Sequence, residues 1–380
     1  MNKYNKHLIT AIALIHSGTS YALDPAAIDF DGIEVTPALE VSGTYDDNYQ
    51  AIKNGPDSWI TTIAPGVQIT AYGDKTLYQL KSGIKHDMYS ASNAKDLTSY
   101  FVKGTGTFNF DVRNKLDIEA GLNRTESAAN AYVPGTINSF KQTNIGASYV
   151  YGAPSATGNI ELGVNHVIYR SDNGLNLDRE RDSNAYRAAF LYKVTDKTKL
   201  VAELNGSRYD YITNKALNST NLSYLLGAQW EATAKTTGHA KIGSETKDFD
   251  DANRKNASLT TWEVSVDWSP LTYSTVIFTT NQKIDEGSYG ASYTDTTNNN
   301  LRWKHDWGRG YASQVYLSNR TDDYKGIRKD TTNSVGAGIT YNIRRWADIA
   351  FDYQNSNRTS TDNAQEYNRN IFKLTFTVGL

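Results

Sequence analysis

The sequence of 380 residues contains no cysteine, and its charges of opposite sign almost cancel. Without cysteine, disulfide frameworks, thiolate zinc sites and cysteine nucleophiles are excluded. The 39 Lys and Arg residues against 41 Asp and Glu give a net charge of −2. That balance argues against nucleic-acid binding by bulk charge and against an acidic tail, so nucleic acid is not an expected partner.

Long apolar runs are missing as well. Hydropathy predicts no membrane-spanning helix, because that would need about 18 or more consecutive apolar residues. Hydrophobic residues make up 39% of the chain, below the ~45–50% usual for a soluble domain. Aromatic residues nevertheless reach 12%, mostly as 26 Tyr, and there are 28 Gly. This composition is typical of an outer-membrane β-barrel, whose apolar surface faces lipid and whose interior is wet.

The N-terminus has the pattern of a secretory signal peptide over residues 1–22. Lys3 and Lys6 supply the positive start, residues 8–15 a short apolar stretch, and residues 20–22 a small-x-small cleavage site. The alternative is an amphipathic first helix of the mature fold. The signal predicts export from the cytoplasm of a Gram-negative bacterium, and a cleavage site without cysteine excludes lipoprotein processing.

Period-two alternation dominates the chain from Ile33 to the end. In 186–194, 262–268 and 372–380, apolar residues occupy every second position and mostly polar ones the positions between. Such segments predict strands with one lipid-compatible face and one hydrated face. The segment 372–380 also resembles the closing strand that barrel-assembly machinery reads. We therefore expect a short periplasmic segment over 23–32 and a barrel over 33–380.

Short turns alternate with long polar loops, which is the rhythm of an up-and-down barrel. The loops are expected at 46–57, 90–98, 126–138, 170–183, 210–219, 248–257, 285–297, 322–332 and 355–365. The count gives an all-β, antiparallel transmembrane barrel of about 18 strands, with 16 or 20 as alternatives. An even number places both termini in the periplasm. The expected location is the outer membrane, where lipid and lipopolysaccharide surround the barrel.

Aromatic residues suggest two girdles at the membrane interfaces. Trp230, Trp268, Trp307 and Trp346 fall beside short turns. Tyrosines gather at the strand ends that border long loops, namely Tyr45, Tyr49, Tyr89, Tyr169, Tyr209, Tyr211, Tyr324, Tyr353 and Tyr367. The alternative is β-propensity alone, because Tyr and Trp suit strands anywhere.

Patterns for catalysis or metal binding are not found. His86, His166, His239 and His305 are scattered, without a metal-ligand spacing. No G-x-S-x-G segment occurs, and an adjacent His-Asp pair on a strand points to opposite faces. We expect no metal, no cofactor and no enzymatic activity. A surface hydrolase built on the barrel is a less favoured alternative.

The lumen is the remaining candidate site. The alternation places these charged residues on the inner wall: Glu40, Lys81, Lys85, Lys103, Asp117, Glu119, Glu161, Arg187, Lys193, Glu203, Glu231, Glu263, Asp267, Arg302, Lys304, Arg320, Asp348, Asp352 and Lys373. Both signs are present, and many of these groups are expected to pair across neighbouring strands. A mixed wall suits a large neutral or weakly charged solute better than selective capture of a small ion.

One stretch resembles a known family. Residues 57–90 combine a strand containing Pro65-Gly66, a tight turn at Gly73-Asp74 and a return strand ending in aromatics. This stretch and the ending at 367–374 are similar to the putative β-barrel porin 2 family. The resemblance implies export of exopolysaccharide or capsular polysaccharide across the outer membrane, together with a periplasmic polysaccharide-export lipoprotein. It carries no catalytic motif. The alternative function is a general diffusion porin for sugars or other small solutes.

Overall fold

The computed structural model describes residues 27–131, 135–233 and 235–379, and these are almost entirely β-strand. The first strands are β1 (Ile28–Phe30), β2 (Ile33–Asp46), β3 (Ser58–Tyr72), β4 (Thr76–Tyr89), β5 (Leu97–Asn109), β6 (Asn114–Ser127), β7 (Asn138–Tyr151), β8 (Gly158–Ser171), β9 (Arg181–Thr195) and β10 (Thr198–Tyr211). They are followed by β11 (Ser219–Thr233), β12 (Thr236–Phe249), β13 (Ala257–Leu271), β14 (Ser274–Glu286), β15 (Tyr293–Gly308), β16 (Tyr311–Tyr324), β17 (Arg328–Arg344), β18 (Ala347–Ser360) and β19 (Tyr367–Gly379). Three 3₁₀ turns, η1 (Leu177–Arg179), η2 (Lys215–Leu217) and η3 (Asn363–Gln365), lie in the connections.

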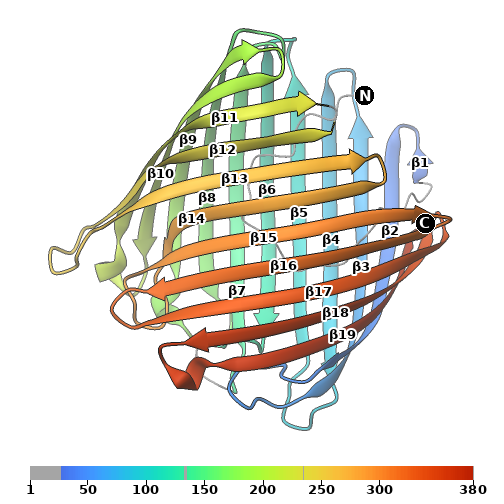
Figure 1. Ribbon diagram of the computed structural model, residues 1–380, viewed down its shortest axis with the longest axis vertical. Helices are drawn as coiled ribbons and strands as arrows, with labels where there is room; N and C mark the ends of the chain where they lie inside the picture. The colour runs from blue at the N-terminus through green and yellow to red at the C-terminus, as the bar shows by residue number, and fades with distance from the viewer. Residues whose placement is uncertain (1–26, 132–134, 234, 380) are drawn as a thin grey trace.

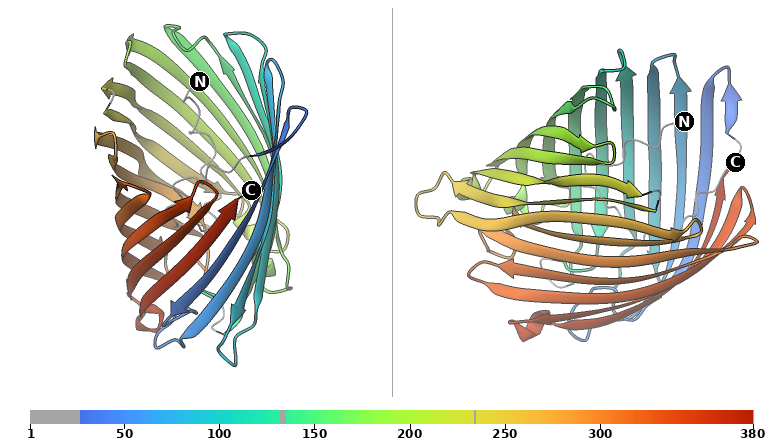
Figure 2. Two further views of the ribbon diagram at one scale, coloured as in Figure 1. Left: turned by 90° about the vertical axis from the view of Figure 1, so that its right-hand side faces the viewer. Right: turned by 45° about the horizontal axis from the view of Figure 1, so that its top comes forward.

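Strands β2 to β19 form a closed antiparallel barrel. Each strand pairs with the next, and β19 pairs back onto β2, with Val378 opposite Leu39 and Phe372 opposite Tyr45. Two views show the strands curving around one enclosed space, and strands of the near wall cross those of the far wall (Figures 1 and 2). The predicted fold class and the count of 18 strands are confirmed. Closure removes the free sheet edges that would be unsatisfied in lipid.

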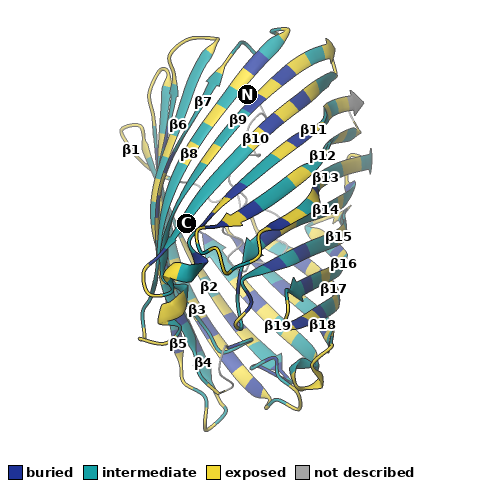
Figure 3. Cartoon of the chain, turned by 90° about the vertical axis from the view of Figure 1, so that its left-hand side faces the viewer, coloured by how far each residue is buried: buried dark blue, intermediate teal, exposed yellow. Residues whose placement is uncertain are grey.

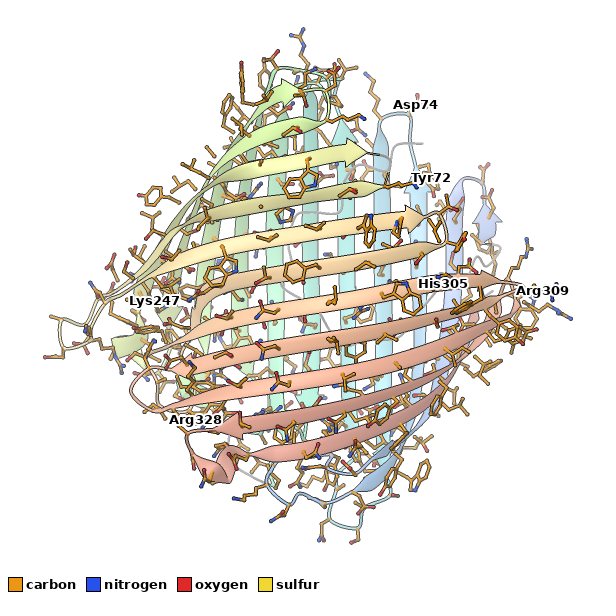
Figure 4. All side chains as sticks on the ribbon, viewed as in Figure 1. Tyr72, Asp74, Lys247, His305, Arg309 and Arg328 are labelled. Carbon is orange, nitrogen blue, oxygen red and sulfur yellow. The ribbon has the colours of Figure 1, made fainter. Side chains whose placement is uncertain are left out.

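The two ends of the barrel differ in their connections. One end has turns of two residues at 196–197 and 309–310, and the other has loops as long as 47–57. Asp74 and Arg309 lie at the short-turn end, and Lys247 and Arg328 toward the long-loop end (Figure 4). The loop expected over 322–332 is much shorter in the structure, residues 325–327, because β16 and β17 keep pairing up to Tyr324 and Arg328. Polar strands that continue beyond a membrane look like loops in the sequence.

The faces of the strands follow the predicted alternation. On β9, Tyr186, Phe190 and Tyr192 are exposed on the outer face, whereas Ala189 and Leu191 between them are buried on the inner face. The same striping of exposed and covered positions runs along many strands (Figure 3). Within the described residues, no helix is long and apolar enough to cross a membrane.

The two expected aromatic girdles have different outcomes. Trp268, Trp307 and Trp346 are exposed beside short turns, as expected for an interfacial girdle. At the long-loop end the expectation was wrong for most tyrosines. Only Tyr45 and Tyr353 of that group lie on the outer face within the described strands. The others, Tyr49, Tyr89, Tyr169, Tyr209, Tyr211, Tyr324 and Tyr367, turn to the inside of the mouth, where cations and neighbouring rings pack against several of them.

The N-terminal boundaries stay predictions. The proposed signal peptide over 1–22 lies outside the described residues. Within the segment 23–32, β1 folds back onto β2, with Ile28 opposite Val35. Asp31 and Gly32 make this tight turn with positive φ values of 54° and 87°, a conformation that glycine adopts without strain.

Candidate functional site in the lumen

The structure places the sequence-derived candidates on the inner face of the wall. All of the charged candidates lie within strands. The strand register turns these to the lumen: Lys81, Lys85, Glu119, Arg187, Glu203, Glu263, Asp267, Arg302, Lys304, Arg320 and Asp352. Lys193, Glu231 and Asp348 lie near the short-turn end of their strands. The wall brings many of them into contact with groups of opposite charge, so its charge is locally compensated.

A chain of ion pairs crosses β8 to β13. Arg187 on β9 donates from Nη1 to Glu161 on β8 at 2.8 Å and from Nη2 to Glu203 on β10 at 2.9 Å. Glu203 also lies 3.2 Å from Nζ of Lys241 on β12. The intervening β11 has Gly227 in register with Lys241, so no side chain separates them there. One carboxylate thus receives two cations from different strands.

The chain continues onto β13. Lys241 Nζ lies 3.0 Å from Glu263, whose other oxygen lies 2.8 Å from Nε2 of His239. Each charged side chain in this part of the wall therefore lies against at least one of opposite charge. Lys241 and His239 were not among the lumen candidates predicted from the sequence, although their inward parity on β12 would have allowed it.

On β15 to β18 the inner wall carries uncharged polar groups beside charged ones. The guanidinium of Arg302 lies 5.4 Å from the ring of Tyr316, whose hydroxyl donates to Gln354 at 2.7 Å. Asp352 accepts from Gln314 at 3.4 Å. Amide and hydroxyl groups of this kind exchange hydrogen bonds with water and with polar solutes.

Two loops from nearly opposite walls meet across the long-loop end. The β6–β7 loop and the β14–β15 loop are eight strands apart in the barrel of eighteen, yet the hydroxyl of Tyr289 donates to the carbonyl of Asn130 at 3.2 Å. Asn130 also donates from its amide N–H to the carbonyl of Gln50 at 2.9 Å, and its side-chain oxygen accepts from Arg358 on β18. These four residues form the mouth bridge, which narrows the entrance.

The backbone of the mouth bridge is held in an unusual conformation. Asn130 and Tyr289 both have positive φ values, 53° and 54°. For a bulky residue such as tyrosine this is uncommon and persists where surrounding contacts hold it. Here Tyr289 packs against Arg328, whose guanidinium lies 4.1 Å from its ring and 4.6 Å from that of Tyr324.

A buried lysine fixes the inner wall near the same end. Lys247 on β12 is 0% exposed, and its Nζ lies 2.5 Å from Glu286 on β14 and 3.1 Å from Asn221 on β11. The ammonium group also lies 4.5 Å from the ring centre of Tyr209, and Tyr211 donates to Glu286 at 2.6 Å. Lys247 and Glu286 were not predicted as wall residues, because Lys247 adjoins the expected loop 248–257 and Glu286 lies within the expected loop 285–297.

Carboxylates in the long loops are held by cations on the outer side of the strands. Hydrogen bonds from Lys141 and Arg124 lower the pKa of Asp172, in the β8–β9 loop. Hydrogen bonds from Arg208 likewise lower the pKa of Asp250, in the β12–β13 loop. Both loops are therefore tied to the wall by charge at neutral pH.

The four histidines of the described strands lie apart from one another. His86 and His166 lie on the outer face, bonded to Thr98 at 2.9 Å and to Asn184 at 2.8 Å. His305 packs 4.1 Å from the ring centre of Trp307. Among the described residues, no group of three or more metal-ligating side chains comes together.

The sequence matches the putative β-barrel porin 2 family over residues 29–379. The chain belongs to this family. Among solved structures, this porin is similar to Pseudomonas aeruginosa OpdK, solved with vanillate, at 12% identity and a TM-score of 0.51, covering 91% of this chain and 99% of that one. It is also similar to P. aeruginosa OccK2 (OpdF) in complex with glucuronate, at 12% identity and a TM-score of 0.53, covering 92% and 98%. Acinetobacter baumannii OccAB3 follows at 10% identity and a TM-score of 0.50, covering 92% and 100%.

No curated protein matches the sequence. The family and the shared barrel identify the chain as an outer-membrane β-barrel porin, in agreement with the expected location. At these low identities the solved structures establish the fold alone. The comparisons give no support for export of a polysaccharide.

Proposed function

We propose that this porin is a passive diffusion channel for small polar solutes, with the short turns and both termini on the periplasmic side. The mouth bridge is the observation that carries the proposal. A barrel of 18 strands leaves an aqueous channel, and loops that join across its entrance restrict what enters. A polymer conduit would be expected to keep that entrance open.

The inner wall supports the same function. Its ion pairs and amides give a solute polar surface along the path, and no single sign of charge dominates the walls described above. In OpdK and OccK2, the structures contain vanillate and glucuronate, both small molecules. Passive diffusion needs neither a catalytic group nor a periplasmic export lipoprotein, and lipid and lipopolysaccharide would contact the apolar outer face.

Single-channel recording in planar bilayers tests this function through the bridge. The unmodified porin is expected to conduct without any added partner. Replacing Tyr289 with Phe and Arg358 with Met removes two of the hydrogen bonds to Asn130. Because a hydrogen bond to a charged group contributes roughly 1.5–3 kcal/mol, the bridge should open often and mean conductance should rise.

The control is Tyr311→Phe, which removes a tyrosine hydroxyl from the outer face at the short-turn end. Its conductance should equal that of the unmodified porin. A closed unmodified porin, or bridge variants that conduct like the control, would contradict the proposal.

A further inference from the structure

An aromatic ring lies open to the lumen on β5. Phe101 faces inward by register, because it lies two residues from Lys103 and opposite Gly83 on β4, and yet it is 41% exposed. A Cβ added to Gly83 would lie 2.8 Å from Cε1 of Phe101, so the ring lies directly over the glycine backbone. The flat side of this ring away from Gly83 is left to the channel. An apolar face in a wet wall has a free-energy cost unless something covers it.

Three lysines surround this ring. Lys103 follows Phe101 by two residues on the same face and pairs in register with Lys81. Lys81 and Lys85 lie two residues to either side of Gly83 on β4. The Lys81–Lys103 pair puts like charges directly opposite each other, an arrangement that is destabilising by itself.

The lysines are only partly neutralised. Lys103 Nζ lies 2.9 Å from Glu119, and Lys85 Nζ lies 2.7 Å from Asp87. Within the described part of the chain, no carboxylate forms an ion pair with Lys81. Three ammonium groups against two carboxylates leave a local charge of +1 beside the ring.

We propose that this part of β4 and β5 is a binding site for small monocarboxylates that have a flat ring. The solute's ring stacks on Phe101, and its carboxylate lies between Lys81 and Lys103. This inference rests on the proposed diffusion channel and names a class of solute that the channel favours. The solute binds this site reversibly on its way through the lumen, and the neighbouring polar wall offers it further hydrogen bonds after it dissociates.

The test uses benzoate as the probe in planar-bilayer recordings, with acetate and benzamide as partial probes. Acetate has the carboxylate without the ring, and benzamide the ring without the charge. Benzoate is expected to reduce the ionic current at a lower concentration than either. A Lys81→Gln variant should weaken the benzoate effect by about tenfold, as expected for a charge-assisted hydrogen bond, and Lys81→Arg should retain it.

The ring is tested in the same recordings. Phe101→Leu should weaken the benzoate effect by about fivefold, as expected for loss of ring stacking, and leave the acetate effect unchanged. Lys199→Gln is the matched control, because Lys199 is an inner-face lysine on β10 that hydrogen-bonds Asn159 at 2.9 Å. Insertion of each variant into the bilayer as a conducting channel shows that it is folded.

The outcomes are separable. If the channel conducts but the three probes act equally, or if Lys81→Gln and Lys199→Gln behave alike, the site is overturned and the diffusion channel stands. If the unmodified barrel does not conduct at all, the channel itself is contradicted. In that case, equal retention of benzoate and acetate by the vesicle-bound protein in equilibrium dialysis would overturn the site as well.

Discussion

The ammonium group of Lys247 shows how a single residue depends on its partners in this wall. Lys247 has no exposed surface, so its charge is balanced by the carboxylate of Glu286 and its hydrogen bonding is completed by Asn221. Removing one partner of a buried pair leaves an uncompensated charge, so Glu286→Gln is expected to lower the free energy of unfolding by about 3 kcal/mol. Denaturant unfolding in lipid vesicles, followed by tryptophan fluorescence, measures the change.

The neighbouring residue provides the control. Asp285 pairs with Lys283 at 2.7 Å, and both side chains are in part exposed. Because exposed ion pairs contribute little, Asp285→Asn should cost less than about 1 kcal/mol. Equal losses for the two variants would show that Lys247 is not a buried charge in the membrane-embedded protein.

Asp172 has an expected pH dependence. Hydrogen bonds from Lys141 and Arg124 lower the pKa of Asp172 in the folded protein below 3.8. Its contribution to loop order is therefore complete at pH values above the pKa of an unfolded aspartate. That contribution is lost as the pH falls through the lowered pKa of the folded protein. Protease protection of the β8–β9 loop should be constant between neutral pH and about pH 4, near the unperturbed aspartate pKa, and decline below. Asp172→Asn should be poorly protected throughout, and full protection of that variant would contradict the assignment.

At the scale of the strand, a row of asparagines marks a boundary on the outer face. Asn319 on β16 donates to Asn333 on β17 at 2.8 Å and accepts from Asn299 on β15 at 3.3 Å. The next outward positions toward the short turns are Leu301, Leu317 and Val335, all exposed and apolar. Amides are costly in hydrocarbon, so the row is expected to lie at the outer edge of the lipid belt.

Cysteine labelling locates that edge, because the chain has no native cysteine. In vesicles, Asn319→Cys should react with a membrane-impermeant maleimide, and Leu317→Cys should be protected. Protection at both positions would place the asparagine row inside the hydrocarbon or under another subunit.

The elements also show where sequence patterns stop being informative. The ends of the expected loops 46–57, 126–138 and 210–219 agree to within one residue with the starts of β3, β7 and β11. Alternation is strict where one face of a strand contacts lipid. Beyond the lipid belt both faces are polar, so the expected loop 322–332 ended β16 too early and started β17 too late. The inward tyrosines were assigned to a girdle because period-two spacing does not tell the two faces apart there.

The whole molecule has properties that only closure creates. The mouth bridge joins Asn130 and Tyr289, which are 159 positions apart in sequence. No local pattern identifies such a contact. Likewise, the sequence predicted that Lys81 and Lys103 both line the wall. That the two lysines lie opposite each other, beside the open ring of Phe101, follows only from strand pairing. The family and the barrel were predictable, whereas the restriction at the entrance was not.

The most direct test of the diffusion channel is solute size dependence in liposome swelling. Vesicles containing the unmodified porin are exposed in turn to a monosaccharide, a trisaccharide and a long neutral polysaccharide. We predict rapid entry of the monosaccharide, much slower entry of the trisaccharide and exclusion of the polymer, because the mouth bridge limits entry. Passage of the long polysaccharide through the unmodified porin would contradict the account and restore polymer export as its function.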